Sequence, residues 1–249
     1  MSQPANPRPA QGEPRLRVLM RDGIERVYSH FAAPYDWLSD TIWVGQWRTW
    51  QRALLPFVQG PRVLEVGIGT GRLQLDLIEL GLQTYGIDRA PSMLRVASRK
   101  VLAATGHPIS ACRADVTALP FPDNTFNSVL SANASGYILL PQTHSEVERV
   151  LSPGGRFAIM TGGILAPGVR TKAFRRALHI GRPTSSPPAD APLVIYPYDT
   201  ETQQLGYWVS TIKDHMESVH LHVSMYVAPT PTGSAFLIVG DKDDSNAEA

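Results

Sequence analysis

The sequence has little cysteine, little net charge and no long apolar run. Cys112 is the single cysteine in 249 residues, so an internal disulfide is excluded, and we expect this side chain to pack as a small apolar group in a strand. A formal charge of +1 leaves no dense basic face, so no nucleic-acid partner is expected. Neither a secretory leader nor a membrane-length segment is visible, which makes a cytoplasmic chain the expectation.

Residues 63–88, VLEVGIGTGRLQLDLIELGLQTYGID, read as a strand, a glycine turn, a helix and a second strand that ends in an acid. The turn is GIGTG at 67–71, a leucine run of helical period follows, and Gly81 is a helix stop signal. Such units bind nucleotides, because glycines let the backbone approach the ligand and a carboxylate about 20 residues on contacts a ribose. Asp88 is the candidate for that carboxylate.

The spacing of the glycines separates two ligand classes. A dinucleotide fingerprint needs a third small residue, but its position would fall on Arg72 or Gln74. The run over residues 65–71 is instead E-x-G-x-G-x-G, which resembles the first motif of the class I S-adenosylmethionine (SAM) methyltransferases. The resemblance implies SAM as the cofactor. It assigns cofactor contacts to Glu65, Gly67, Ile68, Gly69, Gly71, Asp88 and Arg89.

Three later segments follow the order expected in the same family. A helix beginning after Asp88 walls the adenine in that family, Asp115 is expected to close the third strand, and residues 126–131 read as the fourth strand. A helix ending near Leu151, a Pro-Gly-Gly turn at 153–155 and a fifth strand come next. By resemblance, further cofactor contacts fall on Met93, Asp115, Val116 and Asn133.

These elements imply an α/β fold with a doubly wound, Rossmann-like, seven-stranded mixed sheet. Near the end, VHLHVSMYV and SAFLIVG are joined by a proline- and glycine-containing loop, so a C-terminal antiparallel hairpin is expected. Residues 15–31 have helical periodicity and would begin a helical cap. The expected organisation is a disordered tail at 1–14, a cap at 15–58, a SAM-binding domain at 59–240 and a disordered acidic tail at 241–249.

Residues 35–50, YDWLSDTIWVGQWRTW, bear on the acceptor. They resemble a signature of the ubiquinone/menaquinone C-methyltransferases, with agreement in identity and spacing at Tyr35, Asp36, Ile42 and Trp50. The resemblance implies a quinol-ring carbon as the acceptor. Other positions of the signature differ, and phospholipid N-methyltransferases share the Tyr-Asp start, so a phospholipid amine stays an alternative acceptor.

Trp43, Trp47 and Trp50 fall on one face of a helix by their spacing. This stripe either packs a cap helix on the core or lines a pocket for an apolar acceptor. In the second interpretation Trp43, Trp47 and Tyr137 contact the acceptor. Tyr35 can also place its ring against the sulfonium, an interaction of ~0.5–2 kcal/mol.

The segment VRTKAFRRALHIG, residues 169–181, has an apolar side and a basic side that carries Lys172, Arg175 and Arg176. It is either a solvated helix or a contact with an anionic membrane surface, where each nearby cation contributes ~1 kcal/mol. A peripheral membrane contact is therefore an alternative location. The sequence does not indicate an oligomeric state.

No residue is assigned as catalytic. Asp36, Tyr137 and His144 are candidate bases, but each also has a structural interpretation, which for His144 is a solvent-exposed position on a helix. His220 and His222 share a strand face without a third ligand, so no metal site is expected. Two other functions stay open: a noncatalytic SAM-binding or scaffold protein, and a methyltransferase that acts on a soluble, non-lipid small molecule.

Overall fold

The computed structural model describes residues 46–132, 136–165, 196–197, 207–230 and 233–244. Its helical elements are α3 (Gln46–Arg52), η1 (Leu55–Phe57), α4 (Arg72–Glu79), α5 (Pro91–Thr105), η2 (Gly136–Leu139), α6 (Pro141–Val150) and α8 (Tyr207–Ser218). Its strands are β1 (Arg62–Val66), β2 (Gln83–Asp88), β3 (Ala111–Arg113), β4 (Phe126–Ala132), β5 (Leu151–Leu165), β6 (Tyr196–Pro197), β7 (Leu221–Thr230) and β8 (Gly233–Lys242).

The strands form one mixed sheet in the order β3-β2-β1-β4-β5-β8-β7-β6. The five strands from β3 to β5 pair in parallel, whereas β8 pairs antiparallel to both β5 and β7. The predicted seven-stranded mixed sheet is confirmed, and the two-residue β6 extends it at one edge. The predicted C-terminal hairpin is also confirmed, because β7 pairs with β8 from Leu221↔Lys242 to Thr230↔Gly233.

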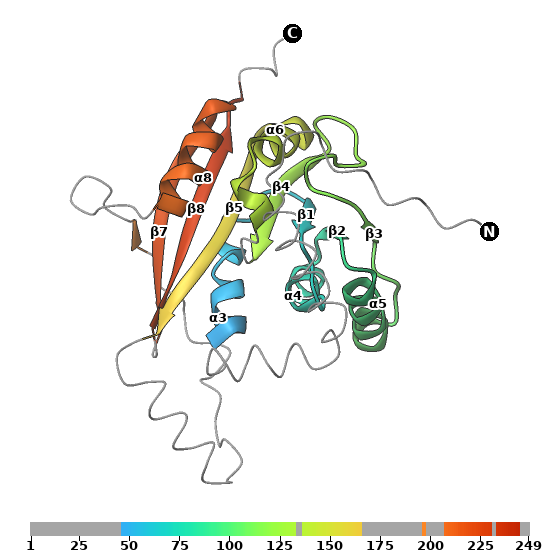
Figure 1. Ribbon diagram of the computed structural model, residues 1–249. Helices are drawn as coiled ribbons and strands as arrows, with labels where there is room; N and C mark the ends of the chain where they lie inside the picture. The colour runs from blue at the N-terminus through green and yellow to red at the C-terminus, as the bar shows by residue number, and fades with distance from the viewer. Residues whose placement is uncertain (1–45, 133–135, 166–195, 198–206, 231–232, 245–249) are drawn as a thin grey trace, which may run out of the picture.

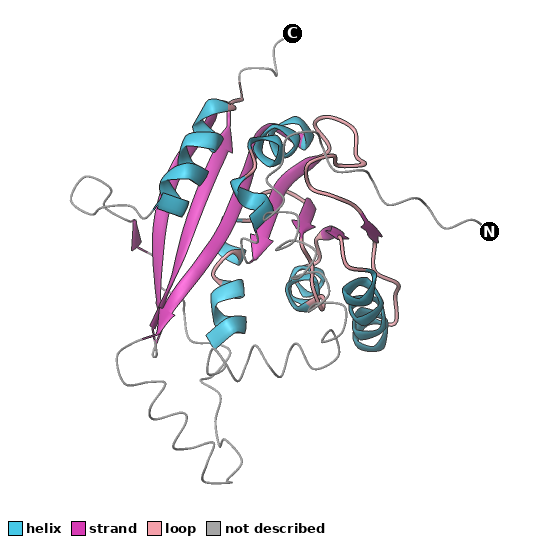
Figure 2. Ribbon diagram, viewed as in Figure 1, coloured by secondary structure: helices cyan, strands magenta, loops and turns pink. Residues whose placement is uncertain are grey.

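Helices cover both faces of the sheet (Figures 1 and 2). Helices α3 and α4 pack on one face with a core that includes Trp50 and Leu77, and α5 lies beside α4. Helices α6 and α8 pack on the other face around Val147 and Met216. Side chains of β5 alternate between the two cores, with Phe157 on the α6 side, so both faces of this strand are buried, as expected for a central strand.

The segment after α6 differs from the predicted helix, turn and strand. Helix α6 ends at Val150 and β5 begins at Leu151, so Pro153-Gly154-Gly155 lies inside the strand. The pairing jumps from Phe126↔Leu151 to Ser128↔Arg156, and Gly154 has φ +68°. Four residues of β5, 152–155, therefore stand opposite Asn127 alone, and this irregularity accommodates the proline between two paired positions.

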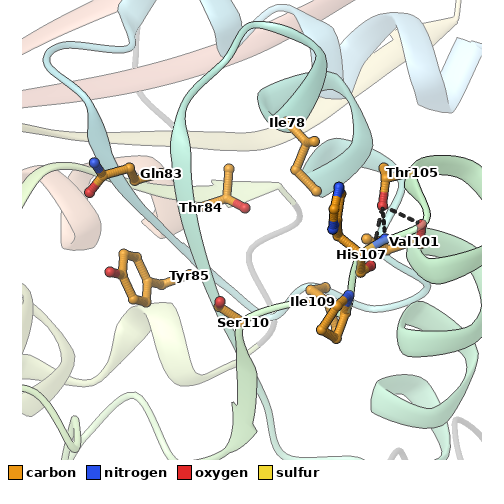
Figure 3. A pocket seen from close by; sticks show the side chains of 10 residues that line it. Ile78, Gln83, Thr84, Tyr85, Val101, Thr105, His107, Ile109 and Ser110 are labelled. Carbon is orange, nitrogen blue, oxygen red and sulfur yellow. Dashed lines mark hydrogen bonds between the residues drawn. The ribbon is translucent and has the colours of Figure 1, made fainter.

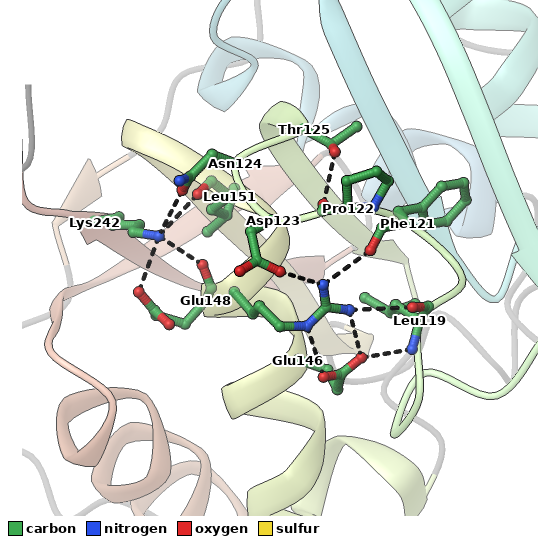
Figure 4. Close-up of polar contacts among 11 residues, drawn as sticks. Leu119, Phe121, Pro122, Asp123, Asn124, Thr125, Glu146, Glu148, Leu151 and Lys242 are labelled. Carbon is green, nitrogen blue, oxygen red and sulfur yellow. Dashed lines mark hydrogen bonds and ion pairs between the residues drawn. The ribbon is translucent and has the colours of Figure 1, made fainter.

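Two groups of ion pairs and hydrogen bonds, around Arg149 and around Lys242, connect α6 to neighbouring segments (Figure 4). Arg149 donates to Glu146, to Asp123 and to the carbonyls of Leu119 and Phe121, with distances of 2.7–3.1 Å. Lys242, at the end of β8, donates to the carbonyls of Glu148 and Leu151, each at 2.9 Å. These contacts hold the end of β8 against α6. Strand β8 itself ends at Lys242, two residues beyond the domain boundary that we expected at residue 240.

Two smaller expectations are wrong. Cys112 is exposed, because β3 is a three-residue strand at the edge of the sheet, where no strand covers its outer side. His220 does not share a strand face with His222: it lies before β7 with φ +61°. His222 is on the strand and its Nε2 lies 2.6 Å from a carboxylate oxygen of Asp243.

Candidate functional site

The glycine turn follows β1 at the carboxyl ends of the parallel strands. The N–H groups of Gly67 and Ile68 donate to the carbonyl of Ile87 at 2.9 and 3.1 Å, which ties the turn to the end of β2. Gly71 has φ +78°, and a Cβ there would lie 3.0 Å from the Cβ of Ala97 on α5. Gly69 has φ +53° and open space where a Cβ would project. The turn therefore presents bare backbone on one side and packs closely on the other.

Asp88 lies directly beside this turn. Its Oδ2 accepts a hydrogen bond from the Gly69 N–H at 2.9 Å, and its Oδ1 accepts one from the Ala90 N–H at 2.8 Å. Burial raises the pKa of the Asp88 carboxyl above its ordinary value, and the two N–H donors oppose the rise. Each carboxylate oxygen keeps a lone pair for a further donor, so the fixed carboxylate can receive two hydroxyl groups.

Glu65 is a buried acid one strand residue before the turn, with 1% of its surface exposed. Burial raises its pKa to about 8, and the nearby carboxylates of Asp88 and Asp76 add to the rise. The amide of Gln74, which donates to Glu65 at 2.8 Å, acts in the opposite direction and lowers the pKa. Gln74 was not a predicted site residue. The sequence did hold a signal for it, because Gln74 is a polar residue on the face of the helix that carries the apolar Leu73 and Leu77. A polar residue on a buried face needs a hydrogen-bond partner.

The predicted adenine contacts are only partly arranged as expected. Asp115 lies two residues beyond the end of β3 instead of closing the strand, and its Oδ1 accepts hydrogen bonds from the N–H and hydroxyl of Thr117. Its Oδ2 lies 3.5 Å from Nε of Arg89. Val116 and Met93 are buried, at 4% and 3% exposure. Asp115 and Arg89 therefore form a half-exposed polar pair, whereas Met93 and Val116 are buried in two separate apolar clusters.

Tyr137 in η2 lies over the glycine turn. Its hydroxyl is 3.3 Å from Ser131 Oγ at the end of β4 and donates to the carbonyl of Val66 at 3.4 Å. A Cβ added to Gly67 would come within 2.7 Å of the same hydroxyl oxygen. The structure thus brings Tyr137 together with the predicted turn, near the carboxyl ends of β1 and β4.

The two described tryptophans of the stripe are core residues. Trp47 and Trp50 are 6% and 0% exposed, and their ring centroids are 6.5 Å apart in an edge arrangement. A Cβ on Gly163 would meet the Trp50 ring at 2.6 Å, so this ring packs flat against the glycine backbone of β5. Arg48 fastens α3 to α4 through Asp76 at 2.8 Å. This burial is what the packing interpretation predicts; contact between Trp47 and an acceptor stays a prediction.

The predicted solvent-exposed position of His144 is wrong. Its side chain is 0% exposed, its Nε2 lies 2.8 Å from the carbonyl of Ile138, and burial lowers its pKa to about 4. The reason is that α6 packs against α8, which belongs to a distant part of the sequence. His144 is therefore neutral near pH 7 and enclosed, so it does not suit a base that contacts an acceptor.

Some predicted residues lie outside the described part of the chain. They are Tyr35, Asp36, Trp43, Asn133 and the basic segment 169–181. Within the described ranges, no three His, Cys, Asp or Glu side chains form a group able to hold a metal ion. None of the described helices is both long and apolar enough to cross a membrane.

A cavity of about 310 Å³ has a lining that includes Ile78, Thr84 and His107 (Figure 3) and no residue of the glycine turn. Its wall includes Gln83 and Tyr85 from the amino-terminal half of β2 and Ser110 just before β3. Ligands of open α/β sheets bind at the carboxyl ends of the strands. The geometry of the turn, Asp88 and Tyr137 therefore marks the candidate site, and this cavity does not.

Comparison with known proteins agrees with this location. Residues 64–159 match the family model described as "Methyltransferase domain". The chain is 31% identical over 166 residues to a demethylmenaquinone methyltransferase of Symbiobacterium thermophilum, covering 64% of this chain and 63% of that protein. It is 33% identical over 157 residues to a 2-phytyl-1,4-naphtoquinone methyltransferase of Synechococcus elongatus, covering 58% and 66%. The alignment thus spans less than two thirds of either relative.

The fold has solved counterparts. A Thermotoga maritima structure described as a SAM-dependent methyltransferase, possible histamine N-methyltransferase, superimposes with a TM-score of 0.54 at 14% identity, covering 88% of this chain and 99% of that one. At this identity the likeness concerns the fold. Residues 64–159 therefore carry a methyltransferase domain, within the fold of the SAM-dependent methyltransferases that the sequence resembles.

Proposed function

We propose that the protein is a SAM-dependent methyltransferase that acts on an apolar acceptor, with a quinol-ring carbon as the foremost candidate. The observation that carries the proposal is the hydrogen bond between Gly69 and Asp88. It places the open backbone of the turn beside a carboxylate of the kind that binds ribose hydroxyls, and both residues lie within the segment 64–159 that matches the family model. The similar proteins named demethylmenaquinone methyltransferase and 2-phytyl-1,4-naphtoquinone methyltransferase support the acceptor class.

The residues present fit SAM in three respects. Gly69 leaves the backbone open to a ligand, and Asp88 retains acceptor capacity for two ribose hydroxyls. Glu65 offers a carboxyl group that a cationic amino-acid end would stabilise in its charged form. Met93 and Val116 are buried apolar side chains that we propose as contacts for the adenine base. We propose as the full cofactor set Tyr35, Glu65, Gly67, Ile68, Gly69, Gly71, Asp88, Arg89, Met93, Asp115, Val116 and Asn133.

SAM supplies an activated methyl group on a sulfonium. The work left to the chain is to hold donor and acceptor in line and to exclude water, and such alignment supplies ~7–11 kcal/mol of a barrier. Tyr137 is suited to this positioning because its hydroxyl is fixed between the ends of β1 and β4. We assign no general base, since His144 is enclosed and Asp36 lies outside the described residues.

For the acceptor, we propose contacts with Trp43, Trp47 and Tyr137. A phospholipid amine is the second acceptor class, and the basic segment at Lys172, Arg175 and Arg176 would then meet an anionic leaflet. A soluble acceptor and a noncatalytic SAM-binding role are the remaining alternatives.

Incubation with methyl-labelled SAM tests these proposals. The native protein is given, in parallel, a short-chain demethylated naphthoquinol, phosphatidylethanolamine vesicles and a total lipid extract. We expect label in the quinol and, at limiting SAM, about five- to 150-fold less label with an Asp88→Ala variant. Label in the phospholipid alone would replace the quinol proposal, with Arg175→Glu/Arg176→Glu as the matched variant. SAM binding without transfer to any of the three would favour the noncatalytic role.

A further inference from the structure

Two consecutive residues of α6 bind the backbone of the short helix η2. Thr143 Oγ1 donates to the carbonyl of Tyr137 at 2.7 Å, and His144 Nε2 lies 2.8 Å from the carbonyl of Ile138. Both α6 side chains are 0% exposed. Two successive carbonyls of η2 are thus fixed by two successive side chains, which leaves this helix little freedom to turn about its axis.

The side chain that this arrangement orients is Tyr137. Its hydroxyl reaches the carbonyl of Val66 and Ser131 Oγ. The same hydroxyl covers the face of Gly67, where an added Cβ would stand only 2.7 Å away. A rotation of η2 would therefore displace this hydroxyl from its position over the glycine turn.

In the described part of the chain, His144 has no second hydrogen-bond partner that would explain its burial. Since a carbonyl can only accept, Nε2 carries the proton and the neutral ring leaves Nδ1 as an acceptor. This Nδ1 is buried and finds no partner among the described residues. The ring faces Phe157 of β5 and His215 of α8, with centroid distances of 6.1 and 5.5 Å. A buried polar side chain with a single hydrogen bond is costly, and leucine would fill this space without that cost.

We propose that Thr143 and His144 are positioning residues that fix η2 so that the Tyr137 hydroxyl stays over the glycine turn and shapes the donor end of the SAM site. The inference rests on the proposed function, because it assigns the turn to SAM. It assigns His144 a role through Tyr137 and not a contact with SAM or acceptor.

A double-mutant cycle on SAM affinity, measured by calorimetry, tests the proposal. His144→Leu removes the donor, His144→Gln keeps an N–H donor at similar reach, and Tyr137→Phe removes the hydroxyl. We expect His144→Leu to weaken SAM binding about two- to tenfold, the worth of one hydrogen bond, and His144→Gln to restore most of it. In the Tyr137→Phe background, the His144→Leu change should have an effect of less than about twofold, because the residues act as a unit.

Thr143→Val, which removes the other donor at nearly constant volume, provides a second variant should His144→Leu fail to fold. Melting temperatures are recorded for every protein. Additive effects of His144→Leu and Tyr137→Phe, or no rescue by His144→Gln, would overturn the positioning role while leaving the proposed function intact. If the native protein does not bind SAM, the proposed function and this inference both fail.

Discussion

The N–H of Gly69 donates to Oδ2 of Asp88 across 2.9 Å, although the two residues are 19 positions apart in the sequence. Parallel pairing of β1 with β2, with Val66 opposite Ile87, places the turn after one strand beside the last residue of the other. The contact fixes the carboxylate before any ligand arrives, so little side-chain ordering is left to oppose binding.

Replacement of Asp88 by Ala should lower the affinity for SAM. Unpaired ribose hydroxyls in a closed site cost ~1–3 kcal/mol, which corresponds to a loss of about five- to 150-fold. Titration calorimetry measures the change, and Asp214→Ala, an exposed acid on α8, is the control. Equal affinity in the Asp88→Ala variant, or tighter binding of NAD than of SAM by the native protein, would refute the cofactor assignment.

Binding of SAM should release a proton from Glu65. Since the pKa of Glu65 is raised to about 8 by burial, this carboxyl is mostly protonated at pH 7, and a cation placed near it favours the charged form. Calorimetry at pH 7 in buffers of different ionisation enthalpy counts the protons released.

Glu65→Gln is the matched variant for this count, because it keeps the shape of the side chain and cannot ionise. We expect fewer protons released and weaker binding in the variant. The same number of protons in both proteins would mean that Glu65 does not respond to the ligand.

The buried His144 should make the native protein lose stability in mild acid. Its pKa is lowered to about 4 from an ordinary 6.5, so the unfolded chain binds more protons between these values. The contribution is present above pH 6.5 and is lost as the pH falls toward 4. His215, which lies beside His144 on α8, adds to the lowering of the His144 pKa.

Urea unfolding at several pH values measures this effect as the difference between the native protein and His144→Gln. We expect the native protein to lose more stability than the variant between pH 6.5 and 4. Parallel curves would show that His144 does not titrate in this way.

The tryptophans should separate packing from acceptor contact. Trp50→Ala is expected to cost ~3–5 kcal/mol of stability, because it empties a fully buried site. Gly163→Ala should cost ~1–3 kcal/mol, since its methyl group would overlap the Trp50 ring. Thermal and urea unfolding measure both.

Trp47→Phe keeps an apolar ring in the core and is therefore the variant for turnover. A raised KM for the acceptor with unchanged SAM affinity would support Trp47 as an acceptor contact. An unchanged KM would leave it with a packing role alone.

The central elements were predictable because their signals are local. Strands β1 and β4 contain short apolar runs, and Gly69 and Asp88 follow the spacing expected of a glycine turn and a ribose-binding acid. The C-terminal hairpin was predictable for the same reason, as alternation and an intervening turn lie within a few residues of each other.

What the sequence did not predict depends on contacts between distant segments. The burial of His144 arises from α8, some 70 residues later, and the exposure of Cys112 arises from the edge position of β3. Helical periodicity says which face of α6 is apolar, but not that a histidine on it finds a carbonyl of η2. The partnership of Gln74 with Glu65 has the same origin.

The position of β8 between β5 and β7 constrains the order of assembly. Strand β7 precedes β8 in the sequence, yet among the described strands β8 joins it to β5, which lies at least 68 residues upstream of its β8 partners. The hairpin closes over a short loop, whereas docking on β5 has to close a long one. We therefore expect the hairpin to form early and to join the sheet as a unit, so that docking on β5 sets the folding rate of this half of the domain.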